Sequence, residues 1–329
     1  MPGLMNLLFP VLATLIWAAS TVVNRMAVGL IDPAAISFYR WLVAAVVITP
    51  FVFTTVWSIR RTIQTHLAKL FALGCLGMSL YQSLAYFAAY SITATSMGLI
   101  LATMPMLTVL LAIPLLRARP TAGTLAGALI SFLGLAWLIS TGDLAALFRQ
   151  GMGKGEFMML MATLSYALYC VLVKRWQIPL PIWVSLYVQI LCGTLVLVPP
   201  FLLAPSAALT RDNLPLVLFA GLFASAMAPG LWMRGLVSLG AEKTAALMNL
   251  VPLFTAVLAI MLLGETLHLY HAMGGSLILV GIALGQMSQR RITDPPRPQT
   301  TGTETSSLSS SMALPLRMRS RSSSDKPRP

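Results

Sequence analysis

The chain has 329 residues, of which 57% are hydrophobic and only 9% are charged, and its mean hydropathy is +0.83. These values lie outside the range of soluble globular proteins, so lipid must surround most of the folded chain. The net charge of +13 does not indicate nucleic-acid binding, because the basic residues lie mainly in short loops and after residue 289, without interleaved aromatics. The 3 cysteines fall within apolar runs without CxxC spacing, so neither a disulfide framework nor a zinc site is indicated, and no cofactor is expected.

Apolar runs of about twenty residues follow one another along the chain, each long enough to cross a hydrocarbon layer of ~30 Å as a helix. The first run starts almost at Met1 without a charged n-region or a cleavage site, so it is predicted to be a retained span. Ten transmembrane helices are predicted at residues 4–23, 34–54, 68–89, 94–116, 121–140, 155–173, 182–203, 214–233, 243–263 and 270–289. Residues 290–329 are rich in Ser, Thr, Pro and Arg, which predicts a disordered basic cytoplasmic tail.

Lys and Arg are divided unevenly between alternate loops, and such a bias orients membrane helices with their basic loops in the cytoplasm. With a cytoplasmic N-terminus, the inside loops contain Arg60, Arg61, Lys69, Arg117, Arg119, Lys174, Arg175, Arg234 and Lys243, followed by Arg290 and Arg291. The outside loops contain Arg25, Arg149, Lys154 and Arg211. Both termini are therefore predicted to be cytoplasmic.

The chain also contains an internal repeat. A displacement of 147 residues aligns, without a gap, Ala94 with Ala241, Pro105 with Pro252, Thr108 with Thr255, Gly127 with Gly274 and Gly134 with Gly281. A displacement of 149 residues aligns Ala13-Thr14-Leu15 with Ala162-Thr163-Leu164 and Trp17 with Tyr166. The two predicted domains are residues 4–140 and 155–289, and chance similarity between apolar sequences is the alternative explanation.

Each half holds five predicted spans, an odd number, so the second half must enter the membrane from the opposite side. The loop charges agree, since Arg117 and Arg119 follow span four whereas the matching loop after span nine, residues 264–268, carries Glu265 and no Lys or Arg. The predicted fold class is therefore an all-α integral membrane protein of ten helices in two inverted five-helix repeats. Such repeats commonly place a substrate site near the midplane and rock to expose it alternately, which favours a transporter over a receptor or scaffold.

Several short motifs resemble the drug/metabolite transporter superfamily, specifically its EamA-like ten-helix branch. They are Trp17-Ala18-Ala19-Ser20, Phe38-Tyr39-Arg40, Ala89-Tyr90-Ser91, Ala245-Ala246 with Pro252-Leu253, Leu263-Gly264-Glu265, Gly274 and Gly281. The resemblance covers nearly all of the chain except the tail, but Ala118 stands where the second half has Glu265, so a role for that acid does not transfer to the first half. The family implies a multi-pass permease of the bacterial inner membrane, often an exporter of amino acids or related metabolites.

Arg40 is the only charged residue expected deep within a predicted span, and its guanidinium could form a bidentate contact with a carboxylate or phosphate of the substrate. The alternatives are that it reaches the outer interface or pairs structurally with Asp32 or Glu265. Its counterpart in the repeat is Gln189, which predicts an asymmetric cavity. No Asp or Glu lies deep in a span, so both proton coupling through interfacial acids and facilitated transport remain open.

Polar and aromatic residues in other spans extend this candidate pocket. Span three carries a polar stripe, Ser79, Gln82, Ser83, Tyr86 and Tyr90, at helical spacing that should face away from lipid. The predicted substrate-binding residues are Trp17, Arg40, Gln82, Tyr86, Tyr166, Tyr169, Gln189, Trp232 and Asn249. Hydrogen bonding between helices and an interfacial aromatic belt are the alternatives for individual members.

Glycine and proline predict how the helices pack and bend. Gly123 with Gly127, and Gly281 with Gly285, form GxxxG pairs that permit close approach of backbones. Pro105 and Pro252, at equivalent positions, predict a kink in spans four and nine.

The expected partners are the lipid bilayer and a small-molecule substrate, and the sequence leaves open whether the chain forms a homodimer. The alternative function is a membrane-embedded enzyme or lipid-modifying protein, which needs clustered His, Asp or Glu. His268 and His271 near Glu265 form the only such cluster, and an HxxH pair with one acid is a weak metal signature.

A fusion of alkaline phosphatase, which is active only outside the cytoplasm, to residue 329 tests the predicted topology. We expect no phosphatase activity from this fusion and strong activity from a matched fusion within the loop at Arg149. The reverse pattern would refute the cytoplasmic location of the C-terminus.

Overall fold

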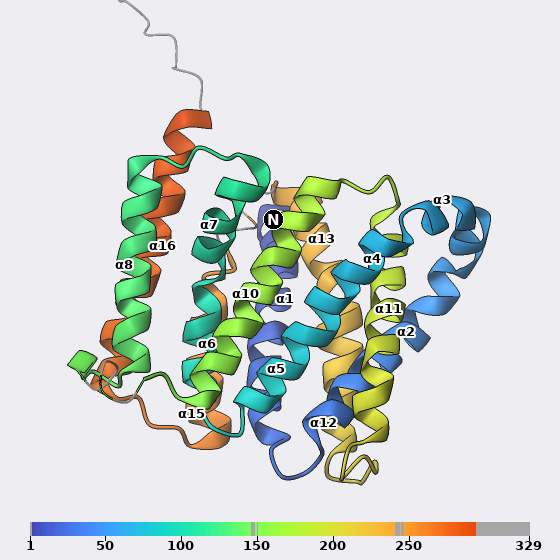
Figure 1. The fold of residues 1–329 in the computed structure, drawn as a ribbon, viewed down its shortest axis with the longest axis horizontal. Helices are drawn as coiled ribbons and strands as arrows, with labels where there is room; N and C mark the ends of the chain where they lie inside the picture. The colour runs from blue at the N-terminus through green and yellow to red at the C-terminus, as the bar shows by residue number, and fades with distance from the viewer. Residues whose placement is uncertain (1, 146–148, 150, 241–243, 245–246, 294–329) are drawn as a thin grey trace, which may run out of the picture. The chain divides into compact units, whose positions relative to one another are not determined.

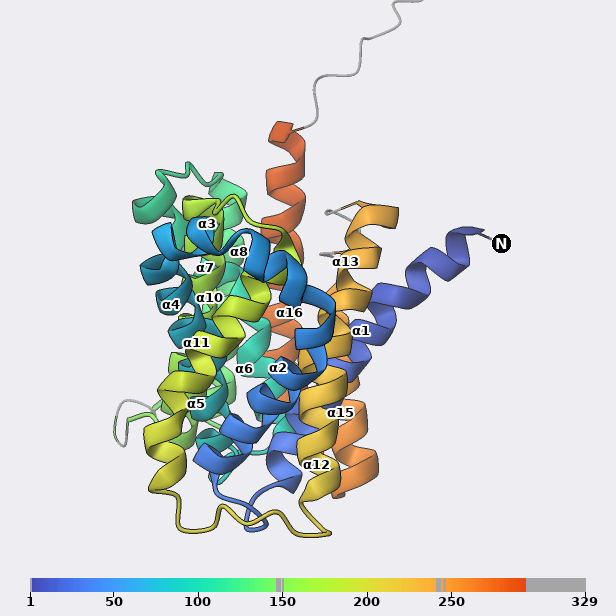
Figure 2. The same cartoon turned by 90° about the vertical axis from the view of Figure 1, so that its right-hand side faces the viewer.

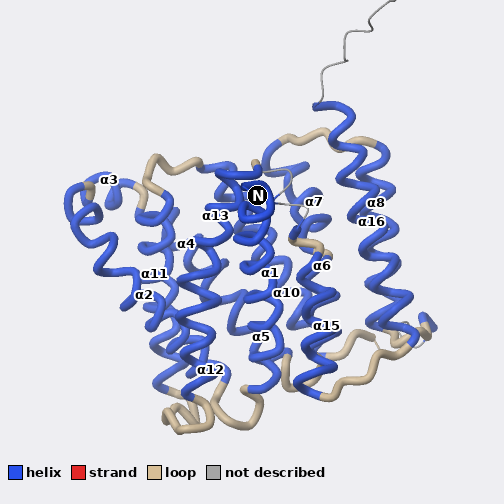
Figure 3. The backbone as a smooth tube through the Cα atoms, turned by 180° about the vertical axis from the view of Figure 1, so that it is seen from behind, coloured by secondary structure: helices blue, strands red, loops and turns tan. Residues whose placement is uncertain are grey.

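The computed structural model describes residues 2–145, 149, 151–240, 244 and 247–293 (Figure 1). Within these ranges all regular structure is helical (Figure 3). They contain 9 helical segments that are long and apolar enough to cross a membrane, and one shorter apolar helix, Leu250–Leu263. The all-α membrane fold is therefore confirmed. Residues 241–243 and 245–246, at the predicted start of span nine, and the predicted disordered tail from residue 294 onward lie outside the described residues.

The first repeat runs from α1 (Pro2–Met26) through α2 (Pro33–Ser58) and the short α3 (Arg60–Thr65) to span three, which comprises α4 (Leu67–Gly74), η1 (Cys75–Leu80) and α5 (Tyr81–Ala88). Span four comprises α6 (Ala94–Ala102) and α7 (Met104–Leu116), and span five is α8 (Ala122–Ile139). The second repeat contains α10 (Lys154–Trp176), α11 (Ile182–Leu202), α12 (Leu214–Leu218), η2 (Phe219–Met227), α13 (Ala228–Leu239), α15 (Leu250–Leu263) and α16 (Leu269–Thr293).

The two repeats face each other along α2 and α11. Phe38 stacks on Phe201 with ring centroids 4.3 Å apart, and the hydroxyls of Thr49 and Tyr187 lie 2.8 Å apart. These pairs, one toward each end of α2, show that α2 and α11 run antiparallel. Because α2 and α11 are equivalent helices of the two repeats, their antiparallel packing is what an inverted duplication requires.

The last helices of the two repeats, α8 and α16, pack as a pair at one side of the bundle (Figure 1), the side turned away from the viewer in Figure 2. A Cβ atom on Gly134 would lie 2.7 Å from the carbonyl oxygen of Gly274, and one on Gly127 would lie 2.7 Å from the backbone nitrogen of Gly285. The two backbones are thus in direct contact, so glycine is required on both sides of the interface. The predicted packing role of Gly127, Gly281 and Gly285 agrees with this contact.

Spans four and nine are interrupted at equivalent places. In span four α6 ends at Ala102 and α7 begins at Met104, with Pro105 in its first turn. In span nine α15 begins at Leu250, and Pro252 lies in its first turn. Proline lacks an N–H, and the first turn of a helix is where that donor is not needed. Each proline therefore marks the start of a new half-helix rather than a bend within one helix.

Spans three and eight each contain a π-helical segment at the same place in the repeat. A displacement of 147 residues carries η1, residues 75–80, onto residues 222–227 within η2. Isolated π turns are uncommon and occur often at functional sites. The segment η2 packs against α2, and η1 packs against α11. The recurrence of the π segments in both halves therefore makes the surroundings of α2 and α11 a candidate functional region.

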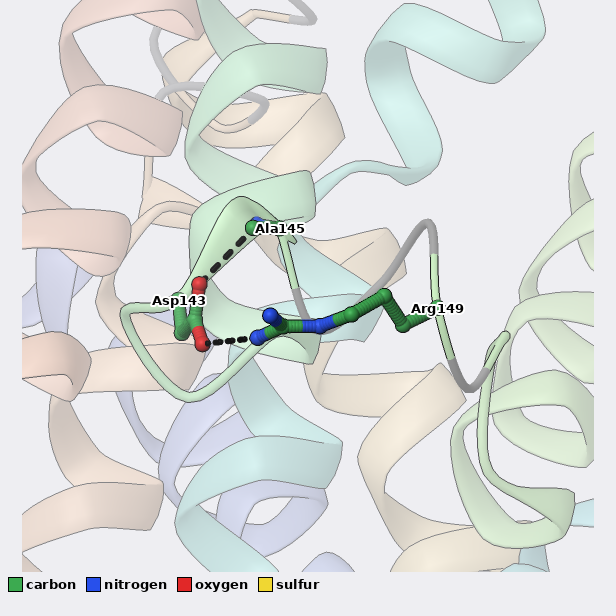
Figure 4. A network of polar contacts seen from close by, with 3 residues as sticks. All are labelled: Asp143, Ala145 and Arg149. Carbon is green, nitrogen blue, oxygen red and sulfur yellow. Dashed lines mark hydrogen bonds and ion pairs between the residues drawn. The ribbon is translucent and has the colours of Figure 1, made fainter.

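The described part of the connection between the repeats contains an exposed ion pair (Figure 4). Arg149 Nη2 lies 3.2 Å from Asp143 Oδ2, and Asp143 Oδ1 accepts a hydrogen bond from the backbone N–H of Ala145 at 3.0 Å. The two charged side chains are 69% and 57% exposed, so the pair contributes little stability.

Replacing Gly127 with Leu should destabilise the protein by about 2 kcal/mol, because the new side chain would collide with the α16 backbone. The unfolding temperature in detergent, followed by size-exclusion chromatography of heated samples, measures this. Ala126→Leu is the matched control, since Ala126 is exposed on the same helix. Equal stability of the two variants would contradict a direct α8–α16 backbone contact.

Candidate functional site

Arg40 lies two turns into α2, and its side chain is only 5% exposed. Its Nε donates to Ser225 Oγ at 2.7 Å, and its Nη1 donates to Ser20 Oγ at 2.9 Å. The guanidinium carbon lies 5.5 Å from the centroid of the Trp41 ring. Ser20 belongs to α1 of the first repeat and Ser225 to η2 of the second, so Arg40 joins the two repeats.

The charge of Arg40 has no acidic partner within ion-pair distance in the described part of the chain. Asp32 instead accepts from the backbone N–H of Ala34 at 2.8 Å and caps α2, and Glu265 binds α6. The predicted alternatives for Arg40, a structural ion pair with Asp32 or Glu265 or escape to the interface, therefore do not apply. Ser225 and Ser20 each accept one hydrogen bond from the guanidinium, and its further N–H groups could bind a planar anion.

The π-helical segments accept hydrogen bonds from the side chains around Arg40. Trp41 Nε1 donates to the carbonyl of Met78 at 2.8 Å, and Ser165 Oγ donates to that of Leu76 at 2.8 Å, both in η1. In η2 the carbonyl of Ala224 accepts from Trp17 Nε1 at 3.2 Å. A π turn alters the regular hydrogen-bond ladder and leaves carbonyls available to side chains. The two segments thereby hold the indoles of Trp41 and Trp17, the first of which lies next to the guanidinium of Arg40.

Aromatic rings from both repeats surround this region. The rings of Trp17 and Trp232 have centroids 5.4 Å apart, those of Tyr81 and Tyr166 4.8 Å, and those of Tyr166 and Tyr169 5.2 Å. Tyr81, Tyr86 and Tyr166 lie within electrostatic range of Arg40. The hydroxyl of Tyr86 is buried close to the guanidinium of Arg40. Among the predicted site residues, Tyr86 and Tyr166 thus lie near Arg40, and ring contacts link Tyr169 to Tyr166 and Trp232 to Trp17.

The remaining predicted residues lie in different surroundings. Gln82 Nε2 lies 3.4 Å from Asn24 Oδ1, which is a weak contact between α5 and α1. Gln189 Nε2 donates to Ser185 Oγ at 2.9 Å, while its Oε1 is buried without a partner in the described part of the chain. Because Tyr187 is level with Thr49, Gln189 lies roughly 10 Å from Arg40 along the helix axis. Asn249 is half-buried next to the start of α15.

The polar stripe predicted on span three is buried over most of its length. Ser79, Gln82 and Tyr86 are 4%, 2% and 1% exposed. Tyr90, however, is 47% exposed, which corrects the expectation that the whole stripe faces away from lipid. The reason is that α5 ends at Ala88, so the helical spacing does not continue to Tyr90.

Glu265 forms a second contact between the repeats, at the end of the bundle opposite α3. Its carboxylate accepts from the backbone N–H of Ala94 at 2.7 Å, from that of Thr95 at 3.0 Å and from the Thr95 hydroxyl at 2.7 Å. These donors lie in the first turn of α6, where a negative charge is favoured. A loop of the second repeat is thus bound to a helix of the first. The equivalent residue Ala118 has no side chain that could do this.

His268 and His271, the weak metal candidate of the sequence analysis, lie near the contact between Glu265 and α6. His271 Nε2 lies 3.2 Å from Ser96 Oγ, and His271 Nδ1 accepts from the backbone N–H of His268 at 3.2 Å. Among the described residues no three His, Cys, Asp or Glu side chains form a metal-binding group.

A cavity of about 760 Å³ lies between α2, the start of α11 and η2. We call it the lateral cavity. Its lining comprises Val47, Ile48, Phe51, Val52, Thr55, Pro181, Trp183, Val184, Leu222, Phe223, Ala226 and Met227. Its volume is typical of ligand pockets, and its lining carries no charge.

We call Arg40 and the residues next to it the Arg40 cluster: Trp17, Ser20, Trp41, Tyr81, Tyr86, Tyr166 and Ser225. Four of them, Ser20, Trp41, Tyr81 and Ser225, are not among the predicted substrate-binding residues. Ser225 aligns with the apolar residue Met78 at the displacement of 147 residues, so the repeat alignment gives no signal for it. Trp41, in the regular helix α2, carries no such signal either. Tyr81 directly follows η1, and a π turn changes which face of a helix a residue occupies.

Comparisons with known proteins agree with this architecture. A family model described as the EamA-like transporter family matches residues 4–140 and 153–285. An uncharacterized transporter of Archaeoglobus fulgidus is 25% identical over 285 residues, which cover 85% of this chain and 96% of the relative. The uncharacterized transporter YyaM of Bacillus subtilis is 23% identical over 266 residues, which cover 78% of this chain and 86% of YyaM.

A solved crystal structure matches 88% of this chain and 98% of its own with a TM-score of 0.57 and 17% identity, which supports the fold alone. The family model, in contrast, covers most of both inverted repeats. The resemblance to the drug/metabolite transporter superfamily is thereby confirmed, and the chain belongs to the EamA-like transporter family.

Proposed function

We propose that this transporter exports small organic metabolites that carry a carboxylate, such as amino acids or related compounds, across a bacterial inner membrane with both termini cytoplasmic. The observation that supports this substrate class is Arg40, whose buried charge lacks an acidic partner among the described residues. A charge within the membrane costs roughly 3 kcal/mol on insertion scales, so an uncompensated one is retained for a function. A carboxylate on the substrate would offset that cost.

The fold supports alternating access as the mechanism. Arg40 contacts Ser20 of one repeat and Ser225 of the other, so a bound anion lies where both repeats can respond to it. The interrupted spans four and nine place the start of a half-helix at equivalent depths in each repeat. Discontinuous helices at the midplane are typical of transporters with inverted repeats.

The contact of Glu265 with α6 supports a difference between the two membrane faces in how firmly the repeats are held together. It binds the repeats together at one face only, since the other face has Ala118 at that position. Rocking of the repeats would separate Glu265 from α6 when that face opens. The structure would then correspond to a state closed at the face of Glu265, which the loop charges assign to the outside.

Replacing Arg40 with Gln should lower transport of carboxylate substrates at least about tenfold, because it removes charge-assisted hydrogen bonds to the anion. The protein should still be expressed, and Arg40→Lys should retain part of the activity. Counterflow in proteoliposomes with a panel of radiolabelled amino acids, each paired with its carboxamide, measures this.

The wild type should transport the acids in preference to the carboxamides, and the Arg40→Gln variant should lose that preference. Ser58→Ala is the control, because Ser58 is exposed and bonds only within its own helix among the described contacts. Unchanged transport of the acids by Arg40→Gln would contradict the proposed role of Arg40.

Replacing Glu265 with Gln should destabilise the protein by about 1 kcal/mol, because a neutral amide interacts less well with the start of α6. Thermal unfolding in detergent measures this. Asp212→Asn is the control, because Asp212 is exposed at the same face. A loss of stability no larger than that of the control would show that the Glu265 contact is not stabilising.

A further inference from the structure

The lateral cavity is separate from the Arg40 cluster, and none of its lining residues contacts the guanidinium through a described hydrogen bond. Phe51, Phe223 and Met227 are 80%, 43% and 41% exposed, and all three lie within membrane-spanning segments. In a bilayer these side chains face acyl chains, so the cavity opens to lipid. An apolar cavity of this size next to lipid can accept a chain or ring from the bilayer.

A difference between the two repeats creates the cavity. At the other end of α2 and α11, Phe201 stacks on Phe38 at 4.3 Å and packs against Tyr39 at 5.2 Å, so aromatic rings fill the space. In the repeat alignment the counterpart of Phe201 is Val52, which is buried and lines the cavity. Val52 is smaller than Phe201, so the space that the Phe201 ring fills at one end of the helices stays open at the other end.

Basic residues lie at the same end of these helices as the cavity. Its lining comes from the last three turns of α2 and the first residues of α11. Arg60 and Arg61 begin α3 directly after α2, and Lys174 and Arg175 lie in the last turn of α10, directly before α11. All four side chains are exposed.

Packing between these segments brings the basic residues to one region. Ile63 of α3 and Val184 of α11 belong to one apolar cluster, against which Ile178 and Leu180 of the α10–α11 loop also pack. Val184 also lines the cavity. The cluster therefore links the cavity to the segments that carry Arg60, Arg61, Lys174 and Arg175. The equivalent end of the other repeat has Arg25, Asp32, Arg211 and Asp212, two basic and two acidic residues, which do not form a basic group.

We propose that the lateral cavity is a binding site for an anionic phospholipid, with an acyl chain in the cavity and the phosphate near Arg60, Arg61, Lys174 and Arg175. Two independent observations point to this ligand. The apolar volume suits a chain, and the positive charge at its end suits an anionic headgroup. The loop charges assign this end to the cytoplasmic side, where the lipid would come from the inner leaflet. The proposal does not depend on the identity of the transported substrate.

Native mass spectrometry of the delipidated protein, titrated with palmitoyl-oleoyl phosphatidylglycerol or with the corresponding phosphatidylcholine, tests the proposal. The wild type should bind phosphatidylglycerol more tightly. The double variant Arg60→Gln, Arg175→Gln should bind phosphatidylglycerol roughly 30-fold more weakly while its affinity for phosphatidylcholine stays unchanged. Arg211→Gln is the charge control at the opposite end.

Val52→Phe should fill the cavity and weaken binding of both lipids, and Val47→Phe serves the same purpose if Val52→Phe does not fold. Val46→Phe is the matched control, because Val46 is 64% exposed on the same helix and does not line the cavity. Equal affinity of the wild type for the two lipids would overturn the proposal. Lipid binding that is unchanged in both cavity-filling variants would also overturn it. A loss of transport in Val52→Phe with lipid binding intact would overturn it as well, and would indicate that the cavity is a route for the substrate.

Discussion

In a membrane, every backbone N–H and C=O group must find its hydrogen-bond partner within the protein, and this requirement governs the structure from spans to site. It accounts for the helical structure of the described residues, but it also restricts where a helix can be irregular. The π segments η1 and η2 are tolerated because Trp41 and Ser165 bind carbonyls of the first and Trp17 binds one of the second. The side chains that satisfy these carbonyls lie around Arg40. Irregular backbone and the candidate site therefore have one common cause.

Duplication gives the two repeats the same framework, and three substitutions make them differ. Arg40 corresponds to Gln189 in the repeat alignment, Glu265 to Ala118, and Phe201 to Val52. Each pair has a distinct physical effect, namely a buried charge, a contact between repeats and a cavity. On the mechanism proposed above, the shared framework would permit rocking, and the differences would give the two faces of the membrane different chemistry.

The sequence predicted the helices from the length of the apolar runs and their inverted arrangement from the Lys and Arg of the loops. It predicted the glycine contact from the spacing of residues without a side chain. It also predicted Arg40, since a charge in an apolar run is conspicuous. It did not predict Ser225, which is one of many small polar residues in the spans and becomes informative only when η2 brings it against Arg40. The lateral cavity was equally hidden, because a cavity is defined by what neighbouring helices leave unfilled. Gln189 is the counterpart of Arg40 in the repeat alignment, but an inverted repeat places such counterparts at different depths in the bundle, so the two side chains do not meet.

Under the alternating-access mechanism proposed above, the contact of Glu265 with α6 would affect transport kinetics. A contact present in one end state and without a counterpart in the other makes the empty carrier unequally distributed between them. The gradient reached at equilibrium stays the same, because it depends only on the driving force. The half-saturating concentrations on the two sides must differ, however, since substrate on the less populated side first has to draw the carrier into the state that can bind it.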